Sequence, residues 1–561
     1  MTVEGRISRW PRLRPEVWSA YAVAWRVAVL LAAAWVVLFL ATFGSVLGAI
    51  DWNADIASTF TIGELYPHVP NGATVTLASY PWYATLWFEL LTRHLPFHRE
   101  IWEVTPWLGS LAAIGVLAWA TAKVAGWWAA GILALTLACA GKSLLLIQFG
   151  TSQHGTVVWY ACLLNAFLML VVARAGKVGP WAVHVLLATL VAAVLAAGLA
   201  SDKLVYLAAL APFVAAGLVA SRLAPRAVAV RVGFTTIAVA VAAVIGGRIA
   251  VEAMRDRDVV AGPYPISLTA TTQLVQNALH ALQSLFTIFN GGFDRQAVNA
   301  RGLLALACAL VVLAAVVVAA RFAFRWTSEL AHRLAAGEPE RSTALLLRTT
   351  HLSFWLCAAL VPLAAYVVTT VPNENSGRYL VTTAYGVVVL IVVGVVEPSR
   401  ARRTAVTVAA CVIVAASIVS LTRDFDTSLG DEMVRDVLPF VQGEGLTRGY
   451  GAYWTAVPLT WRSHMRVQVT PVVSCPKSPH GLCAYYNHTI SNWYVPRPDT
   501  RSFLIVDHRY GPPPPGKRLG GTAEVVDFPH YSVYVYDYDI ASNIKPDWWH
   551  YIPSDVGPPP Q

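Results

Sequence analysis

The chain contains many apolar stretches that are long enough to cross a lipid bilayer. A membrane-spanning helix needs about 20 apolar residues, and this sequence of 561 residues contains about eleven such windows. Hydrophobic residues make up 56% of the chain and charged residues only 13%, against about 25% in soluble proteins. The sequence therefore predicts a polytopic α-helical membrane protein with about 11 transmembrane helices. The windows lie at 24–48, 106–122, 127–140, 156–173, 181–200, 204–220, 232–250, 302–320, 351–371, 380–396 and 404–421.

Arginine and lysine are distributed unevenly over the connections between these windows. If the Arg-rich N-terminus lies inside, every second connection is basic, and the short outer connections carry few cations. This alternation predicts a cytoplasmic N-terminus in a plasma (inner) membrane, where membrane lipid is one partner. The net charge of +9 then belongs to helix flanks, and no nucleic-acid partner is expected. The inner cations are Lys123, Arg174, Lys177, Arg222, Arg226, Arg231, Arg321, Arg325, Arg333, Arg341, Arg348, Arg400, Arg402 and Arg403.

Three longer segments fall on the outer side in this topology. The segment 49–105 is longer than two helices need as a connection. The segment 251–300 carries leucines at helical spacing, which predicts an amphipathic helix lying on the membrane surface. The segment 422–561 shifts to Pro, Tyr, Trp and Asp. We therefore expect a transmembrane domain over 1–421, followed by an extracytoplasmic domain over 422–561.

Two features of the C-terminal segment indicate a small folded domain of mixed α/β structure. The stretches 502–507 and 531–536 are rich in β-branched and aromatic residues and predict strands. Cys475 and Cys483 flank a Pro-Lys-Ser-Pro turn, and an oxidising compartment would favour a disulfide between them rather than two free thiols. The chain ends in a Pro-rich tail that we expect to be disordered.

Two acids, Asp51 and Asp55, open the first outer segment. They are four residues apart, so a continuing helix would place both carboxylates on one side. A carboxylate at the membrane–water boundary usually pairs, binds a ligand or catalyses. Two interpretations remain open at this point. Either one acid is a general base that takes a proton from an acceptor hydroxyl, or the acids cap the helix and pair with Arg378 or Lys203.

Aromatic and histidine side chains fill the rest of that segment. His68 and Trp82 are candidates for contacting a sugar, because aromatic rings stack on sugar faces. The alternative is the ordinary aromatic belt at the membrane interface. The other members of the group are Tyr66, Tyr80, Tyr83, Trp87, His94 and His98.

Cationic candidates follow in three further outer turns. His154 could bind a phosphate, and Lys203 could reach a lipid phosphate unless Asp202 neutralises it. Arg378 stands at the outer end of a late helix, where the positive end of the helix dipole also favours an anion. Its alternative partners are lipid headgroups and the nearby Glu374.

The order of these residues along the chain resembles the GT-C superfamily of polytopic membrane glycosyltransferases. Members of that superfamily have a large first outer loop with an acidic catalytic residue near the end of helix one. The stretch Asp51-Trp-Asn-Ala-Asp55 occupies that place. An Arg-Tyr element at the start of a late helix is similar to Gly377-Arg378-Tyr379-Leu380, and an outer C-terminal domain is also common.

The resemblance implies an inverting transfer of a sugar from a polyprenyl-phosphate donor to a glycan, lipid or protein acceptor of the cell envelope. Asp51 or Asp55 would act as the base, with Asp51 slightly favoured because it lies closer to the helix end. Some relatives depend on a divalent metal, and the sequence leaves the cofactor unknown. The remaining assignments are the donor phosphate for Arg378, Lys203 and His154, and substrate contacts for Tyr379, Trp82, Glu374 and His68.

Two other classes of function compete with this one. A lipid or polysaccharide transporter or flippase would place polar residues inside the spans, near the membrane midplane. The spans here are nearly free of charge, and the polar residues gather at one face. A non-catalytic assembly protein of the cell envelope would explain the C-terminal domain but would leave the acidic loop and Arg378 without a role.

Overall fold

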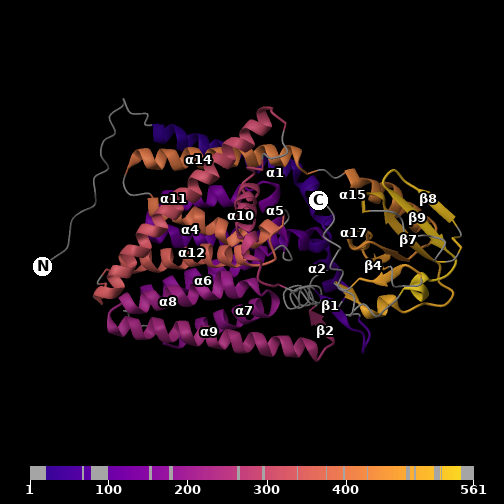
Figure 1. Ribbon diagram of the computed structural model, residues 1–561, viewed down its shortest axis with the longest axis horizontal. Coiled ribbons are helices and arrows are strands. Elements are labelled where there is room, and N and C mark those ends of the chain that lie inside the picture. The colour runs from indigo at the N-terminus through magenta and orange to yellow at the C-terminus, as the bar shows by residue number, and fades with distance from the viewer. Residues whose placement is uncertain are drawn as a thin grey trace.

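A bundle of long helices lies side by side, and a sheet-containing region lies beyond one end of the bundle (Figure 1). We call residues 428–544 the C-terminal domain, and the adjoining end of the bundle the domain end. The computed structural model describes residues 20–65, 69–77, 99–150, 154–175, 181–261, 266–292, 297–337, 339–340, 342–373, 376–395, 399–425, 428–475, 480–485, 488–510, 519, 521–522 and 524–544. The expected Pro-rich tail lies outside the described residues.

Ten helical segments in the described part of the chain are long and apolar enough to cross a membrane, so the protein is a multi-pass helical membrane protein. Seven of them are single helices: α1 (Ala20–Asp51), α6 (Gly155–Arg174), α7 (Trp181–Ser201), α9 (Arg226–Arg255), α11 (Ala300–Ala336), α12 (Thr343–Val368) and α14 (Arg400–Arg423). The others are α4 (Arg99–Ala138), α8 (Ala211–Leu223) after a π-helical turn at Tyr206–Leu210, and α13 (Val381–Val389) between a 3₁₀ turn at Ser376–Leu380 and a π-helical turn at Leu390–Val395.

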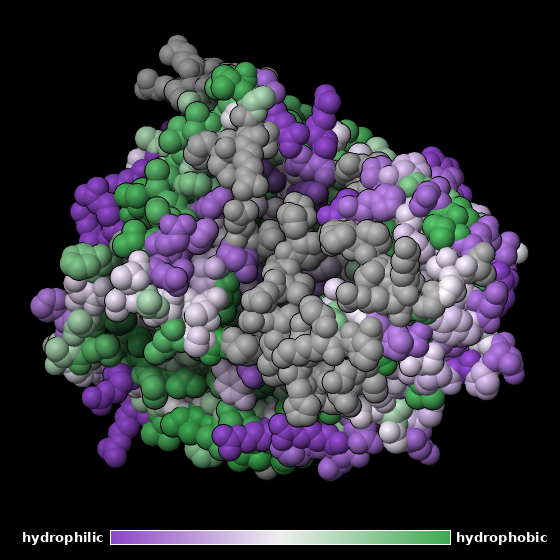
Figure 2. All heavy atoms as spheres, turned by 45° about the vertical axis from the view of Figure 1, so that its right-hand side comes forward, coloured by the Kyte–Doolittle hydropathy of each residue, from purple (hydrophilic) through white to green (hydrophobic). Residues whose placement is uncertain are grey.

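The lateral surface of the bundle is apolar. Along α9, six large apolar side chains recur every three or four residues and are more than half exposed, which forms one continuous stripe. A stripe of this length on a folded surface indicates contact with lipid. Figure 2 shows apolar side chains gathered over the bundle, whereas the C-terminal domain is mostly polar. The stripe consists of Val230, Phe234, Ile237, Val241, Ile245 and Ile249.

Helix α4 covers the predicted window 106–122 and most of the window 127–140, and it reverses direction at Gly126. The backbone of Gly126 is non-helical there, with φ 83° and ψ 170°. Ser110 donates a hydrogen bond to the Gln148 carbonyl at 3.0 Å, and the Gln148 side chain donates to the Leu137 carbonyl at 2.8 Å. A straight helix would hold residues 110 and 137 about 40 Å apart. The ten segments count α4 once, whereas the sequence windows count its two halves separately. The number of eleven membrane crossings therefore stays a prediction.

Small residues let the helices approach closely, as expected where apolar lipid offers no hydrophobic driving force. A Cβ added at Gly247 on α9 would lie 3.2 Å from the Ala196 carbonyl oxygen on α7. A Cβ at Gly386 on α13 would lie 2.8 Å from the Trp355 carbonyl oxygen on α12. These contacts fix the helices that carry the polar turns at the domain end.

Three shorter helices lie in the connections between the spans and pack on the spans: α2 (Ala54–Leu65), α5 (Lys142–Phe149) and α10 (Leu274–Ile288). Most of α2 is buried, so the first outer segment is partly core rather than an open loop. The helix expected within 251–300 is present as α10. One of its faces packs inward through Asn277, Ala281 and Ser284, while Val275 and Leu279 are exposed.

The C-terminal domain is built on a six-stranded mixed sheet in the order β5-β4-β3-β7-β9-β8. The central strands β4, β3 and β7 are parallel, and helix α17 (Tyr453–Arg462) connects β3 to β4. The predicted strands at 502–507 and 531–536 are confirmed as β7 and β9. The element bounds are α15 (Ser428–Glu432), α16 (Leu438–Gly443), β3 (Arg448–Gly451), β4 (Gln468–Ser474), β5 (Leu482–Ala484), β7 (Ser502–Asp507), β8 (Glu524–Asp527) and β9 (Tyr531–Tyr536).

A second, three-stranded sheet joins the segments 49–105, 251–300 and 422–561 of the chain. Strand β1 (Val75–Leu77) of the first outer segment pairs in parallel with β2 (Val259–Ala261), which follows α9. Its other edge pairs antiparallel with β6 (Thr489–Ile490) of the C-terminal domain. The sheet therefore ties this domain to the bundle through main-chain hydrogen bonds.

Two covalent or ionic contacts hold the C-terminal domain together internally. Cys475 and Cys483 form a disulfide bond across the β4–β5 pair, with their Cα atoms 5.5 Å apart. Arg448 and Asp539 form a fully buried ion pair at 2.9 Å. The Tyr450 hydroxyl donates a second hydrogen bond to Asp539 at 2.6 Å. Burying two charges is costly, so the stability of the domain depends on keeping both partners.

We predict that Asp539→Ala destabilises the C-terminal domain by about 3 kcal/mol, because it leaves the Arg448 guanidinium buried without its counter-charge. Hydrogen exchange of the β3 and β7 amides in the full chain measures this loss as faster exchange. The exposed pair Arg435–Asp436 provides the matched control, since Asp436→Ala should leave the exchange unchanged. Equal exchange in wild type and Asp539→Ala would contradict the assignment.

Candidate functional site

The two acids of the first outer segment end up in different surroundings because the helix does not continue through them. Helix α1 ends at Asp51, the chain turns, and α2 begins at Ala54. Asn53 caps the new helix, since its side chain accepts a hydrogen bond from the Ile56 amide at 3.3 Å. The i, i+4 spacing therefore does not place the two carboxylates side by side on one helix face.

Asp51 faces the C-terminal domain. Its carboxylate accepts a hydrogen bond from Arg462, the last residue of α17, at 2.6 Å. The Asp51 side chain is only 2% exposed. A buried carboxylate needs such a partner, so this ion pair joins the end of α1 to α17.

Asp55 faces Arg378, which lies 323 residues further along the chain, and the two form an ion pair at 3.0 Å. The second carboxylate oxygen of Asp55 accepts a hydrogen bond from the Tyr453 hydroxyl at 3.2 Å. The Asp55 side chain is 21% exposed and the Arg378 side chain 26%. Asp55 therefore combines a cation, a hydroxyl donor and access from outside, whereas Asp51 is closed off.

The turn that carries Arg378 is held rigidly against α10 and α12. Ser376 and the Tyr366 hydroxyl of α12 are hydrogen-bonded at 2.7 Å. A Cβ added at Gly377 would lie 3.2 Å from the Cβ of Ser284 on α10, so the backbone approaches that helix closely. The guanidinium of Arg378 lies over the Tyr379 ring, 5.6 Å from its centre.

His154 joins this group through Tyr379. The two rings lie 4.5 Å apart, and the other side of His154 is bonded to Asp202 at 2.6 Å between Nδ1 and Oδ2. His154 and Asp202 are both buried. Asp202 thus pairs with His154 rather than neutralising its neighbour Lys203. Lys203 is exposed in its turn and makes no ion pair with any residue that the structure describes.

The structure brings some of the predicted residues together and separates others. Asp55, Arg378, Tyr379 and His154 form one connected group, and Asp51 lies beside it in a separate ion pair. Lys203 is not part of the group. His68, Trp82 and Glu374, proposed as substrate contacts, lie outside the described residues.

Helix α17 supplies functional neighbours that the sequence did not reveal. Besides Tyr453 and Arg462, it carries Trp461, whose indole donates to the buried Glu103 carboxylate on α4 at 2.8 Å. Trp461 also stacks on Phe60 of α2, with ring centres 5.3 Å apart. These contacts join positions about 350 to 410 residues apart, so no local pattern could have predicted them.

Burial fixes the protonation of two groups around Asp55. The pKa of Tyr453 is raised well above its ordinary value, first by burial and then by the charge of Asp55, so its hydroxyl remains a donor. Burial lowers the pKa of His488 to about 4, although the charge of Asp55 acts in the opposite direction. The His488 ring lies 6.0 Å from that of Tyr453. At neutral pH, His488 is therefore neutral beside the carboxylate.

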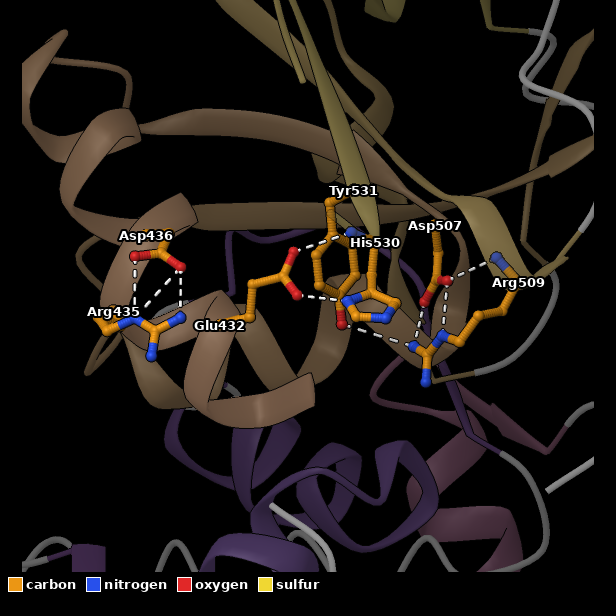
Figure 3. Close-up of polar contacts among 7 residues, drawn as sticks. All are labelled: Glu432, Arg435, Asp436, Asp507, Arg509, His530 and Tyr531. Atoms are coloured by element: carbon orange, nitrogen blue, oxygen red, sulfur yellow. Dashed lines mark hydrogen bonds and ion pairs between the residues drawn. The ribbon is translucent and has the colours of Figure 1, made fainter. Parts of the chain in front are cut away.

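The C-terminal domain presents a second polar cluster at the carboxyl end of its parallel strands (Figure 3). Asp507 ends β7 and accepts a hydrogen bond from Arg509 at 2.7 Å and one from Thr455 of α17 at 3.4 Å. Glu432 accepts a hydrogen bond from His530. Strand order reverses between β3 and β7, and α/β sheets bind ligands outside the carboxyl ends at such a point. Tyr453 lies in the first turn of α17, so this edge adjoins Asp55.

Within the described ranges, no group of three or more His, Cys, Asp or Glu side chains could hold a metal ion. The side chains gathered around Asp55 are one carboxylate, one guanidinium, two phenols and two imidazoles. Comparison with protein-family models, with curated proteins and with solved structures finds no match for this chain.

We predict that Arg462→Ala loosens the C-terminal domain from the bundle by about 3 kcal/mol, because it strands the buried Asp51 carboxylate. Faster hydrogen exchange in α2 and α17 of the full chain measures the change. The double variant Asp51→Asn with Arg462→Gln removes both charges and should recover most of the protection. Unchanged exchange in Arg462→Ala would show that the pair does not hold the interface.

We predict that the C-terminal domain loses stability as the pH falls from about 6.5 to 4, in part through His488. Its pKa in the folded protein lies below the ordinary value of 6.5, so folding favours the neutral ring, and this contribution is lost on acidification. Thermal unfolding of wild type and His488→Gln between pH 7 and 4 tests this, with a shallower loss expected for the variant. Parallel curves would refute a role for His488.

Proposed function

We propose that the protein is a membrane glycosyltransferase that transfers a sugar, with inversion, from a polyprenyl-phosphate donor to a glycan, lipid or protein acceptor. The observation that carries this proposal is the Asp55–Arg378 pair at the domain end of the bundle. A lipid-linked donor reaches such a site sideways from the bilayer, so no nucleotide-binding fold is required. The resemblance to the GT-C superfamily in the order of these residues supports the same reading.

Asp55 is the better candidate for the base, in place of the initial preference for Asp51. A base must reach the acceptor hydroxyl, and the Asp55 side chain is 21% exposed against 2% for Asp51. Asp51 is engaged by Arg462 and has a sufficient structural role in the α1–α17 contact. We therefore assign catalysis to Asp55 and docking to Asp51.

The proposed step is a single displacement at the anomeric carbon of the donor. The acceptor oxygen attacks the anomeric carbon from the face opposite the phosphate, and its proton passes to Asp55 as the new C–O bond forms. The bond between the anomeric carbon and the phosphate oxygen breaks, and the polyprenyl phosphate leaves with both electrons. Arg378 stabilises the charge that develops on the phosphate. The transition state has oxocarbenium character, as in glycoside chemistry.

Arg378 has two roles in this scheme because it already holds Asp55. When the donor phosphate binds, it competes with the carboxylate for the guanidinium. Loss of the cation makes the carboxylate a stronger base, since a nearby positive charge favours its ionised form. Donor binding would thus activate the base, and Tyr379 with His154 would keep Arg378 aligned.

The acceptor would approach from the side of the C-terminal domain. Tyr453 touches Asp55, and the polar edge around Asp507 follows directly behind the first turn of α17. The uneven distribution of Arg and Lys supports a cytoplasmic N-terminus and an extracytoplasmic C-terminal domain in the plasma membrane. The reaction would then take place on the outer face of that membrane.

We predict that Asp55→Asn reduces sugar transfer at least about 100-fold, and that Arg378→Ala reduces it to a similar extent. The assay supplies polyprenyl-phosphate pentoses and hexoses to membranes that contain equal amounts of each variant. Asp51→Asn is the matched control, because it changes a neighbouring acid that we place outside the chemistry, and it should keep transfer within about tenfold of wild type.

Hydrogen exchange of α2 and α17 in the same preparations separates lost chemistry from a lost interface. A folded Asp55→Asn variant with full transfer would overturn the proposal. Equal losses in Asp51→Asn and Asp55→Asn, both with loosened α17, would instead support a purely structural role for the two pairs, as in an envelope-assembly protein.

A further inference from the structure

A cavity of about 140 Å³ lies between α5, α10, α11 and α14, and it shares no residue with the Asp55–Arg378 group. It exceeds many times the roughly 10–15 Å³ that one water molecule requires. Its polar lining comes from four separate elements and includes two cations. Among these polar residues are Lys142, Ser143, Asn290, Arg301, Ser420 and Asp424.

Among the lining residues that the structure describes, the charges do not cancel. Arg301 forms an ion pair with Asp424, which leaves the ammonium of Lys142 as the excess charge. Lys142 makes no ion pair with any residue in the described part of the chain. A cavity that contains an unmatched cation attracts an anion, and the attraction is strong at the edge of a low-dielectric bilayer.

Both cations of the cavity stand at the start of a helix, where an anion is favoured. Lys142 and Arg301 both stand in the first turn of a helix, α5 and α11 respectively. A cation there is repelled by the positive end of the helix dipole, and an anion is attracted. Asp424 at the end of α14 offsets this repulsion for Arg301, with which it forms an ion pair, but not for Lys142. Lys142 therefore has an unfavourable position unless an anion binds beside it.

The cavity is held in shape by contacts between its walls. The Lys142 amide donates to Ser420 Oγ at 3.0 Å, which ties α5 to α14. The Asn290 side chain donates to Ser417 Oγ at 3.0 Å. A Cβ added at Gly141 would lie 2.0 Å from Asn290 Oδ1, so only glycine permits this approach. The lysine is thus presented by a preformed wall.

The remaining wall is apolar and continues onto the lateral surface of the bundle. Leu304, Ala305 and Val419 line the cavity beside the polar groups. On the same helix, α11, Leu303 and Leu310 are more than half exposed. A ligand that fills this site and its surroundings therefore has a small anionic head and an apolar body.

We propose that this cavity binds the phosphate headgroup of an anionic membrane lipid, with Lys142 as its principal contact and Arg301 at the rim. The acyl chains lie along the exposed apolar face of α11. The site is separate from the proposed donor phosphate at Arg378 and does not depend on the proposed function. A soluble phosphate has the same anionic group as the lipid, but it has no acyl chains that could bind to the apolar wall.

The test measures binding of fluorescent phosphatidylglycerol to the purified full chain in neutral detergent. Lys142→Ala should weaken binding by about tenfold or more, because a hydrogen bond to a charged group is lost, and Lys142→Arg should retain most of it. Arg423→Ala is the matched control, since Arg423 is an exposed cation beside Asp424 that does not line the cavity. It should bind like wild type.

Competition experiments distinguish the sources of the phosphate. Unlabelled phosphatidylglycerol should displace the probe, whereas inorganic phosphate in large excess and phosphatidylcholine with the same chains should displace it poorly. Equal binding by wild type and a folded Lys142→Ala variant would overturn the proposal. So would equal losses in Lys142→Ala and Arg423→Ala, or full displacement by inorganic phosphate.

Discussion

The contact between α17 and the end of the helical bundle is the interaction on which the rest of the structure depends. Three acids from the bundle side, Asp51, Asp55 and Glu103, each meet a different side chain of this one helix, namely Arg462, Tyr453 and Trp461. A carboxylate at this boundary costs free energy when it has no partner. Separating α17 from the bundle would remove the partners of all three acids, so the contact is stabilised. The contact fixes the C-terminal domain over the turn that carries Arg378.

Neighbouring acids of similar sequence context thereby acquire different chemistry. Asp51 is enclosed and is paired with a cation through one carboxylate oxygen, which suits a residue that holds two parts of a protein together. Asp55 shares its oxygens between Arg378 and a hydroxyl and remains accessible, which suits a residue that must exchange a proton. The division follows from the turn at Asn53, because that turn directs Asp51 toward α17 and Asp55 toward the start of α13.

The sequence could predict whatever depends on local pattern. Apolar windows predicted the spans, β-branched and aromatic composition predicted β7 and β9, and the eight-residue spacing suggested the bond between Cys475 and Cys483. The turn at Asn53 was not predicted, because the four-residue spacing of the two acids was considered only for a continuing helix. The partners of the acids were not visible, because Tyr453 and Arg462 lie about 400 residues away and only tertiary packing selects them. Lys203 shows the converse, since a basic residue in an outer turn need not reach the site.

The most direct test of the account is an experimental structure of the full chain with a polyprenyl phosphate bound. We predict that the phosphate lies within hydrogen-bonding distance of the Arg378 guanidinium, that the Asp55–Arg378 pair has opened, and that the Asp51–Arg462 pair is unchanged. A lipid phosphate bound elsewhere, with Asp55 and Arg378 still paired at about 3.0 Å, would contradict the assignment of this group as the catalytic centre.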